Sequence, residues 1–201
     1  MLPISVDLAL IRVMLVGDGA AARRRLALLD DARAQALEIY APMPEPTLVA
    51  LAGARLRRRL PSPAEIARSQ LVFVAGVAEP IATEIRRVAK AAGVLVNVED
   101  DRERSDFHSA AVIRRGDLTV AISTNGKSPG LASLMRQALE RRIVPEWELR
   151  LGEIAALRQA WRNAGADPAA VARHTREWVA RQGWFDPAAL PPSQQPPRPI
   201  P

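Results

Sequence analysis

The sequence contains no cysteine and few aromatic residues. The absence of cysteine excludes a disulfide framework, thiolate zinc ligands and a cysteine nucleophile, and it fits a reducing compartment. Only 4% of the residues are aromatic, so the chain offers few platforms on which single-stranded bases could stack. Hydrophobic residues nevertheless make up 48% of the 201 residues, which is enough for one large globular domain or two small ones.

Long hydrophobic runs are missing as well. The apolar stretch 1–17 is interrupted by Asp7 and Arg12, and no basic segment precedes it. It therefore fits neither a signal peptide nor a membrane span. We expect a buried strand near the N-terminus of a cytoplasmic protein that makes no contact with a membrane.

Positive charge is in excess. The formal net charge is +6 and the sequence pI is about 11.0. A basic surface suits nucleic acid, a membrane face or a polyanionic small molecule, and net charge does not choose among them. No nucleic-acid recognition module is evident in the sequence, so nucleic acid is not an expected partner.

Short apolar runs alternate with helical patterns through the first half of the chain. The runs 11–16, 36–40, 71–75 and 94–98 indicate buried strands, and 55–60 indicates a weaker edge strand. Helical patterns cover 20–29, 63–67 and 80–92. This alternation predicts an α/β fold with a Rossmann-type, doubly wound parallel sheet.

The pattern changes in the second half. Two β-rich runs, 110–113 and 118–123, flank the turn 114–117 and predict a hairpin, and Ser128 with Pro129 opens a helix to about residue 142. The chain is helical from residue 145, with breaks near 165–168 and at 183, and the proline-rich tail is expected to be disordered. The predicted domains are 1–113 (cofactor-binding), 114–144 (a small α+β segment), 145–190 (helical) and 191–201 (tail).

A glycine motif follows the first predicted strand directly and opens the first predicted helix. It reads Gly17-Asp18-Gly19-Ala20-Ala21-Ala22 and has the form G-x-G-x-x-A of a dinucleotide-binding turn. The first glycine permits a tight turn, the second lets the backbone approach a pyrophosphate, and the last alanine lets the helix pack close to the strand. The helix N-terminus then offers amides to the phosphates. The motif predicts nucleotide binding.

The choice of nucleotide is less sharply marked. Tyr40 and Ala41 stand where an acidic residue usually ends the second strand, and no arginine follows that would favour a 2′-phosphate. NAD is therefore preferred only mildly over NADP. Asp18 is unfavourable beside a pyrophosphate unless its carboxylate points away.

Three further segments carry a resemblance. They are Leu2-Pro3-Ile4, the run Asn97-Val98-Glu99-Asp100 followed by Phe107, and the run from Ala121 to Ala132, AISTNGKSPGLA. With the glycine motif, they resemble the precorrin-2 dehydrogenase / sirohydrochlorin ferrochelatase family, which also forms the N-terminal half of siroheme synthases. The resemblance covers about residues 1–142 well and the remainder loosely.

The resemblance implies a fold and a reaction. Family members have a Rossmann domain, a dimerisation segment and a helical domain, and they are homodimers whose active site lies between the cofactor domain and elements of the partner chain. NAD accepts a hydride from precorrin-2, a proton leaves, and sirohydrochlorin results. Some members also insert ferrous iron to give siroheme.

By the resemblance, Asp100 matches the aspartate implicated in catalysis. A placed carboxylate suits this chemistry, because loss of a hydride from the tetrapyrrole must be coupled to loss of a proton. The simpler interpretation is that Asp100 only caps the loop after a strand. Asp101 is adjacent, but the spacing to Asn97 and Phe107 favours Asp100. Further cofactor contacts are expected from Tyr40 and from Ala75, Gly76 and Val77, although relatives often carry threonine and an acidic residue or asparagine in the latter stretch.

Substrate contacts are expected in two places. His108 is a candidate donor to a substrate carboxylate, with a purely structural role as the alternative. The polar turn Ser123-Thr124-Asn125-Gly126-Lys127-Ser128 precedes a helix and suits the carboxylates of a tetrapyrrole. Basic residues that would add charge there are Lys127, Arg114, Arg115 and Arg136. The histidines His108 and His174 lack metal-ligand spacing, so no protein-bound metal is expected.

Other interpretations stay open. The chain is either a dehydrogenase alone or an enzyme that also inserts ferrous iron, since one carboxylate serves both reactions. A redox-sensing module that binds NAD without turnover is a second alternative, and nucleic-acid binding through the basic surface is a third. The segment 57–59 is interpreted as a solvated edge, and Trp147, Trp161, Trp178 and Trp184 as packing residues of the helical region.

Overall fold

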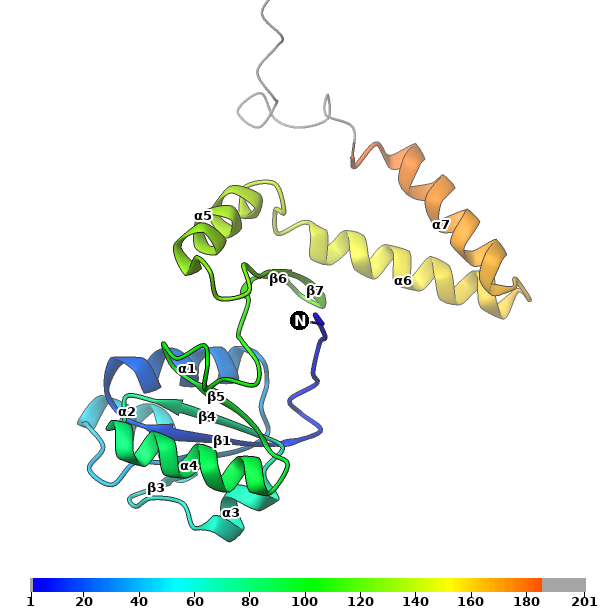
Figure 1. The fold of residues 1–201 in the computed structure, drawn as a ribbon. Helices are drawn as coiled ribbons and strands as arrows, with labels where there is room; N and C mark the ends of the chain where they lie inside the picture. Colours follow the sequence, from blue (N-terminus) through cyan, green and yellow to red (C-terminus); the bar gives the residue numbers. More distant parts are fainter. Residues whose placement is uncertain (1, 186–201) are drawn as a thin grey trace, which may run out of the picture. The chain divides into compact units, whose positions relative to one another are not determined.

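A five-stranded parallel sheet forms the centre of the first half of the chain (Figure 1). Its strands are β1 (Arg12–Gly17), β2 (Ala36–Tyr40), β3 (Leu56–Arg57), β4 (Leu71–Ala75) and β5 (Leu95–Val98). Their order is β3-β2-β1-β4-β5, so the chain reverses its direction of winding between β1 and β4. In open parallel sheets, ligands bind at such a reversal, outside the carboxyl ends of the strands.

The computed structural model describes residues 2–185. The chain divides into unit 1, Met1–Ser109, and unit 2, Ala110–Pro201. The predicted domain boundary after residue 113 falls inside a strand of unit 2, and the proline-rich tail lies outside the described residues.

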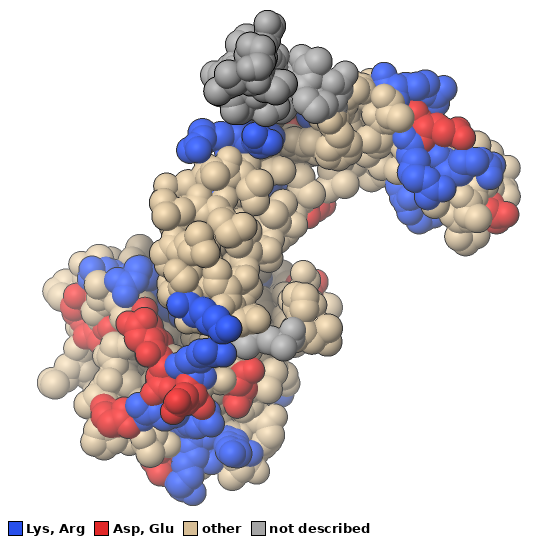
Figure 2. All heavy atoms as spheres, turned by 45° about the horizontal axis from the view of Figure 1, so that its top comes forward, with Lys and Arg blue, Asp and Glu red and all other residues tan. Residues whose placement is uncertain are grey.

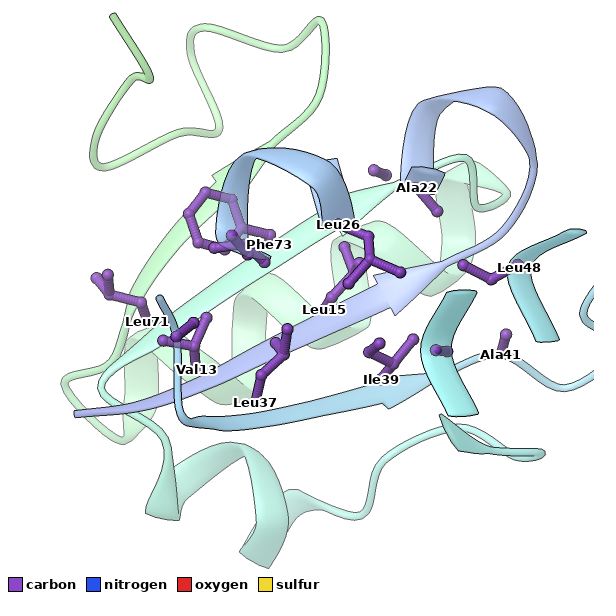
Figure 3. Close-up of a cluster of buried hydrophobic side chains, with 14 of the residues drawn as sticks. Val13, Leu15, Ala22, Leu26, Leu37, Ile39, Ala41, Leu48, Leu71 and Phe73 are labelled. Atoms are coloured by element: carbon purple, nitrogen blue, oxygen red, sulfur yellow. The ribbon is translucent and has the colours of Figure 1, made fainter. Parts of the chain in front are cut away.

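Helices cover both faces of the sheet. Unit 1 contains α1 (Gly19–Asp31), α2 (Pro46–Ala52), the 3-10 turn η1 (Gly53–Arg55), α3 (Pro63–Arg68) and α4 (Glu79–Ala91). Strand β1 alternates between the faces, because Val13 and Leu15 join the core under α1 and α2, whereas Met14 and Val16 join the core under α3 and α4. Figure 3 shows the first of these cores, with Leu26 and Phe73 above the sheet.

The predicted Rossmann-type α/β fold is confirmed, with local differences. The expected cap of α3 is present, because Ser62 and Glu65 form a reciprocal capping box and Pro63 occupies the first turn. The expected edge strand at 55–60 contracts to two residues of β3. Helix α2 was not expected from the sequence, because prolines lie just before it and at its first position and only Leu48 and Ala52 are buried.

Unit 2 begins with a hairpin and continues as three helices. Strands β6 (Ala111–Arg115) and β7 (Leu118–Ile122) pair antiparallel, which confirms the predicted hairpin. They are followed by α5 (Pro129–Glu140), α6 (Trp147–Asn163) and α7 (Pro168–Gln182). Ser128 caps α5 as expected, since its hydroxyl accepts from the N–H of Leu131 at 3.2 Å.

Aromatic side chains join α6 to the end of α7. The ring of Trp184 lies 5.8 Å from that of Trp147 and 5.1 Å from that of Trp178, both nearly edge-on. Trp161 contacts His174 at 5.4 Å between ring centroids. The interpretation of the tryptophans as packing residues of the helical region is therefore confirmed.

Charge is distributed differently over the two units. Figure 2 shows acidic and basic side chains intermixed over unit 1, whereas basic side chains predominate over the α6–α7 end of unit 2.

No helix of the described residues is long and apolar enough to cross a membrane.

Candidate functional site

The glycine motif lies at the carboxyl end of β1, where the backbone passes very close to the end of β4. Gly17 has φ +145°, and a Cβ there would lie 1.6 Å from the carbonyl oxygen of Ala75. Gly76 has φ +68°, and a Cβ there would lie 2.1 Å from the carbonyl oxygen of Asp18. Both positions require glycine, because any side chain would separate the two loops. The structure thus brings Gly76 to the glycine motif.

The second glycine of the motif faces open space. Gly19 has φ +72°, yet a Cβ there would meet no atom within 4 Å. Helix α1 begins at this residue. Within the described chain its first turn carries no acidic residue, and its amides donate to no capping side chain. Ala22 is fully buried and holds α1 close to the sheet. These features fit a pyrophosphate approaching the amides of α1.

The carboxylate of Asp18 turns toward the loop after β2. Both of its oxygens accept from the backbone N–H of Glu45, at 3.1 Å each. It makes no hydrogen bond to the amides of its own helix among the described residues. The carboxylate of Asp18 therefore points toward the loop after β2 and not toward the amides of α1 that would bind a pyrophosphate.

The end of β2 offers no exposed side chain to a ribose. Tyr40 is fully buried, donates to Glu38 at 3.1 Å and packs against Arg59. Burial raises the pKa of its phenol, and Glu38 adds to this effect. Ala41 is buried as well. The carboxylate nearest the glycine motif from this loop belongs to Glu45, which sequence reasoning missed. Its position just before Pro46 at the start of a helix was the available signal.

A cavity of about 190 Å³ opens beside the glycine motif, at the carboxyl ends of β4 and β5. It is lined by Val74, Gly76, Val77, Glu79, Ala82, Val98, Glu99, Asp100, Asp101 and Arg104. The structure therefore brings the predicted catalytic carboxylate together with two predicted cofactor residues, Gly76 and Val77.

Asp100 lies at the centre of three consecutive acidic residues and differs from its neighbours. Glu99 pairs with Arg24 of α1 at 3.2 Å, and Asp101 pairs with Arg104. Asp100 has φ +57° and an exposed side chain that makes no hydrogen bond or ion pair within residues 2–185. A left-handed aspartate with its neighbours held on either side is a typical strained position of a functional loop.

Arg104 joins the Asp100 loop to the first turn of α4. Its guanidinium contacts the carboxylates of Asp101 and Glu79 and donates to Thr83 at 3.2 Å. The backbone N–H of Arg104 lowers the pKa of Asp101, and its guanidinium adds to that effect. The guanidinium also lowers the pKa of Glu79. One wall of the cavity is thereby charged and fixed.

The chain returns along β5 after Asp100. The N–H of Asp106 donates to the carbonyl of Val96 at 2.8 Å, and the amide of Asn97 donates to the carbonyl of Phe107 at 2.9 Å. Phe107 packs edge-on against Phe73 with 5.2 Å between ring centroids. Asn97 and Phe107, which carried the resemblance, thus shape the loop that presents Asp100.

Arg25 and His108 lie at the far end of this loop. Arg25 donates to the hydroxyl of Ser109 at 2.6 Å and stacks over Phe73. Burial lowers the pKa of its guanidinium, and the charge of Glu99 opposes this effect only in part. His108 is half-buried and makes no hydrogen bond among the described residues. It belongs to the same unit as Asp100 but does not line the cavity.

The polar turn 123–128 belongs to unit 2, and each of its hydroxyls takes part in a hydrogen bond with nearby backbone. Thr124 accepts from the N–H of Ser128 at 3.1 Å and donates to its carbonyl at 3.0 Å. Ser123 accepts from the N–H of Asn125 at 3.1 Å, and Asn125 has φ +51°. Lys127 is exposed and therefore offers its ammonium to an anion.

Most of the arginines grouped with this turn have intramolecular partners. Arg115 donates to the carbonyl of Ile143 at 2.7 Å, and both Arg115 and Arg136 pair with Glu140. Arg114 is exposed. In unit 1, Arg57 and Arg59 pair with Glu38 and Glu65, in keeping with a solvated edge. Within the part of the chain that is described, no group of acidic or histidine side chains is arranged to hold a metal ion.

Comparison with protein families shows the family to which unit 1 belongs. A family model described as putative NAD(P)-binding matches residues 4–111, which is more than half of the chain. The chain belongs to this NAD(P)-binding family. A second model, described as sirohaem biosynthesis protein central, matches residues 115–142. The resemblance inferred from the sequence motifs is therefore confirmed.

Curated relatives of this NAD(P)-binding chain are siroheme synthases. Siroheme synthase 1 of Aeromonas salmonicida (strain A449) is 38% identical over 147 residues, which cover 72% of this chain and 30% of the relative. Siroheme synthase of Tolumonas auensis is 34% identical over 151 residues, which cover 75% of this chain and 31% of the relative. The chain thus spans about a third of the length of these relatives.

A solved structure shares the fold. "SirC, precorrin-2 dehydrogenase" matches with a TM-score of 0.73, over 92% of this chain and 93% of that chain, at 20% identity. The NAD(P)-binding match includes the glycine motif and Asp100, and the sirohaem central match includes the turn 123–128. Every predicted site residue therefore lies within a matched segment.

Proposed function

We propose that the chain is a precorrin-2 dehydrogenase that uses NAD and yields sirohydrochlorin. The observation that carries this proposal is the shared cavity of Asp100, Gly76 and Val77 beside the glycine motif. A free carboxylate next to a dinucleotide-binding turn is what a reaction needs that removes a hydride and a proton together. The siroheme synthase relatives and the fold of SirC support the choice of substrate.

The dinucleotide would be held by the glycine motif, and residues 75–77 would contact it at the end of β4. Gly19 leaves room for the pyrophosphate, and the amides of α1 would bind it. When bound, NAD supplies the acceptor for the hydride. The side chain of Tyr40 is buried, so we assign only its backbone a place near the cofactor.

Asp100 would accept the proton. Precorrin-2 loses one hydride and one proton as sirohydrochlorin forms, and the hydride accounts for both electrons. The carboxylate is exposed and has no partner within residues 2–185, so its oxygens are free to take the proton. The paired Glu99 and Asp101 would hold the loop rather than react.

Unit 2 contributes to the proposal through the turn 123–128. The hydroxyl of Thr124 donates within the turn, whereas those of Ser123 and Ser128 only accept hydrogen bonds among the described residues. We therefore assign the contact with a substrate carboxylate to Ser123, Ser128, Lys127 and the backbone amides of the turn. His108 is a proposed second contact with substrate. A homodimer and a cytoplasmic location are part of the proposal and rest on the family resemblance and the sequence.

The proposal is tested anaerobically with the full-length protein, enzymatically generated precorrin-2 and NAD. We expect the absorbance of sirohydrochlorin to appear only when protein and NAD are both present. Cofactor binding without any conversion would instead support a redox-sensing module and would overturn the proposal.

Ferrous iron is then added to the same mixture. Asp100 is also suited to remove protons from pyrrole nitrogens during metal insertion. An enzyme-dependent change of the sirohydrochlorin spectrum would extend the function to a ferrochelatase, with ferrous iron as substrate. A spectrum that changes at the same rate without protein would restrict the function to the dehydrogenase.

A further inference from the structure

We infer that Glu45, Arg23 and Asp18 together select NAD against NADP. The inference rests on the proposed function, because it concerns the same dinucleotide site. The three side chains come from three elements that the sheet brings together: Arg23 from α1, Asp18 from the glycine motif and Glu45 from the loop after β2.

Their position follows from the strand order. Strands β1 and β2 are parallel neighbours, so the loops at their carboxyl ends lie side by side. The two hydrogen bonds of 3.1 Å from the N–H of Glu45 to Asp18 fix this contact directly. In Rossmann folds the ribose of the adenosine lies at this crevice, where a carboxylate accepts from its hydroxyls or an arginine binds a 2′-phosphate.

The charges at this crevice favour a neutral ribose. Arg23 pairs with the carboxylate of Glu45, and both side chains are about one-third exposed, at 33% and 32%. With Asp18, the cluster carries one net negative charge. A 2′-phosphate near a cluster of this sign is repelled, whereas a 2′-hydroxyl donates to a carboxylate at no such cost.

Arg23 would be the phosphate-binding residue if it were free. A guanidinium binds a phosphate through two parallel N–H groups, but here one nitrogen of that guanidinium, Nη1 of Arg23, is engaged by the carboxylate of Glu45. Glu45 therefore acts against NADP twice, by repelling the phosphate and by holding the one arginine of this cluster. Removal of its charge should release Arg23 for the 2′-phosphate.

The test measures the dissociation constants of the full-length protein for NAD and for NADP by calorimetry. Wild type should bind NAD more tightly. In Glu45→Gln the ratio of the NADP to the NAD constant should fall at least about tenfold, through tighter NADP binding, because one unit charge leaves the surroundings of a dianionic phosphate. In Arg23→Gln the ratio should rise, and the double variant should lose the gain in NADP affinity.

Asp30→Asn is the matched control. Asp30 pairs with Arg55 and connects the opposite end of α1 to the segment after α2, with side chains exposed at 43% and 31%. The control changes the net charge equally and should leave the ratio unchanged. Circular dichroism verifies that each variant is folded, and Arg23→Gln decides the matter if Glu45→Gln does not fold.

The outcomes separate this inference from the proposed function. NAD binding with an unchanged ratio in Glu45→Gln, or in Arg23→Gln where that variant decides, would overturn the inference and leave the dehydrogenase intact. A wild type that prefers NADP would overturn the inference together with the choice of NAD in the proposed function, and would leave the oxidation of precorrin-2 untouched. A folded protein that binds neither nucleotide would overturn the proposed function and the inference with it.

Discussion

Unit 1 and unit 2 bury their apolar side chains to very different extents. Unit 1 holds two cores, one on each face of its sheet. In the described part of unit 2 the buried hydrophobic residues are Ile113, Ala132 and Val171. Helix α6 has 17 residues and buries none of them. Unit 1 therefore has an extensive buried interior, whereas the described part of unit 2 has a very small one.

Most of the exposed large hydrophobic side chains in the described part of unit 2 lie on α5 and at the start of α6. Leu131, Leu134 and Met135 of α5 are 51%, 63% and 44% exposed, and Leu149 of α6 is 72% exposed. Leu131, Leu134 and Met135 share one face of α5, and an exposed apolar face on a folded protein commonly marks a protein interface. This surface supports the homodimer in the proposal, whereas the chemistry is assigned to unit 1.

The largest predicted difference between the two units is in the effect of a glycine substitution on the free energy of unfolding. Gly17→Ala places a Cβ into the backbone of Ala75, so we expect a loss of about 4 kcal/mol or more of unfolding free energy. Gly152→Ala in α6 meets no atom within 4 Å and should stabilise its helix by about 0.5–1 kcal/mol. Urea unfolding measured by hydrogen exchange of β1 and β4, and by the tryptophans of unit 2, reports the units separately. Equal effects of the two substitutions would contradict the contrast.

Asp100→Asn should abolish the chemistry of unit 1 without unfolding it. We expect turnover of precorrin-2 to fall by about 10²–10⁴-fold, the usual contribution of a general base, while NAD affinity stays near wild type. Glu103→Gln is the control, because Glu103 is exposed in the same loop. Near-normal turnover in Asp100→Asn would remove the assignment of Asp100 as the base.

Lys127→Gln probes the part of unit 2 in the proposal. An exposed ion pair contributes about 0.3–1 kcal/mol, so the KM for precorrin-2 should rise about two- to fivefold, with kcat and NAD affinity unchanged. Lys90→Gln on α4 removes the other lysine of the chain and should change neither constant. A fall in kcat alone would show that Lys127 acts in the chemical step and not in binding.

The local features of both units were predictable from the sequence. The parallel strands, the glycine motif, the cap at Ser128 and the hairpin each depend on neighbouring residues, and the structure has them all. Helix α2 was missed because its buried side chains are few and prolines lie before it and at its first position. Strand β3 was predicted too long because only Leu56 and Arg57 pair with β2.

The geometry of the site was predictable only in part. The motif around Asp100 was recognisable, but its supports are distant in sequence: Arg24 reaches Glu99 across 75 positions and Arg104 reaches Glu79 across 25. The contact of Glu45 with Asp18 spans 27 positions and exists only because β1 and β2 are neighbours. Such pairs follow from topology, which periodicity does not specify.

Acid should weaken unit 1 slightly through Arg104. Its guanidinium holds the pKa of Glu79 below the ordinary 4.5, and its backbone N–H and guanidinium hold that of Asp101 below the ordinary 3.8. Carboxyls with a lowered folded pKa stabilise the protein above those ordinary values and lose that contribution as the pH falls through the folded pKa. Arg104→Gln should therefore be less stable than wild type at pH 7, and the difference should shrink as the pH falls below 4.5 and then 3.8.

This effect is the smallest of the four, because both carboxylates are solvent-accessible and water screens the ion pairs. The measurement is the urea midpoint of unit 1 between pH 7 and pH 3, followed by hydrogen exchange of β4 and β5. Arg102→Gln, an exposed arginine of the same loop, is the control and should show no such pH dependence. A difference for Arg104→Gln that stays constant at every pH would mean that the side chain stabilises the loop by packing. The charge of Arg104 would then have no part in holding the wall of the cavity beside Asp100.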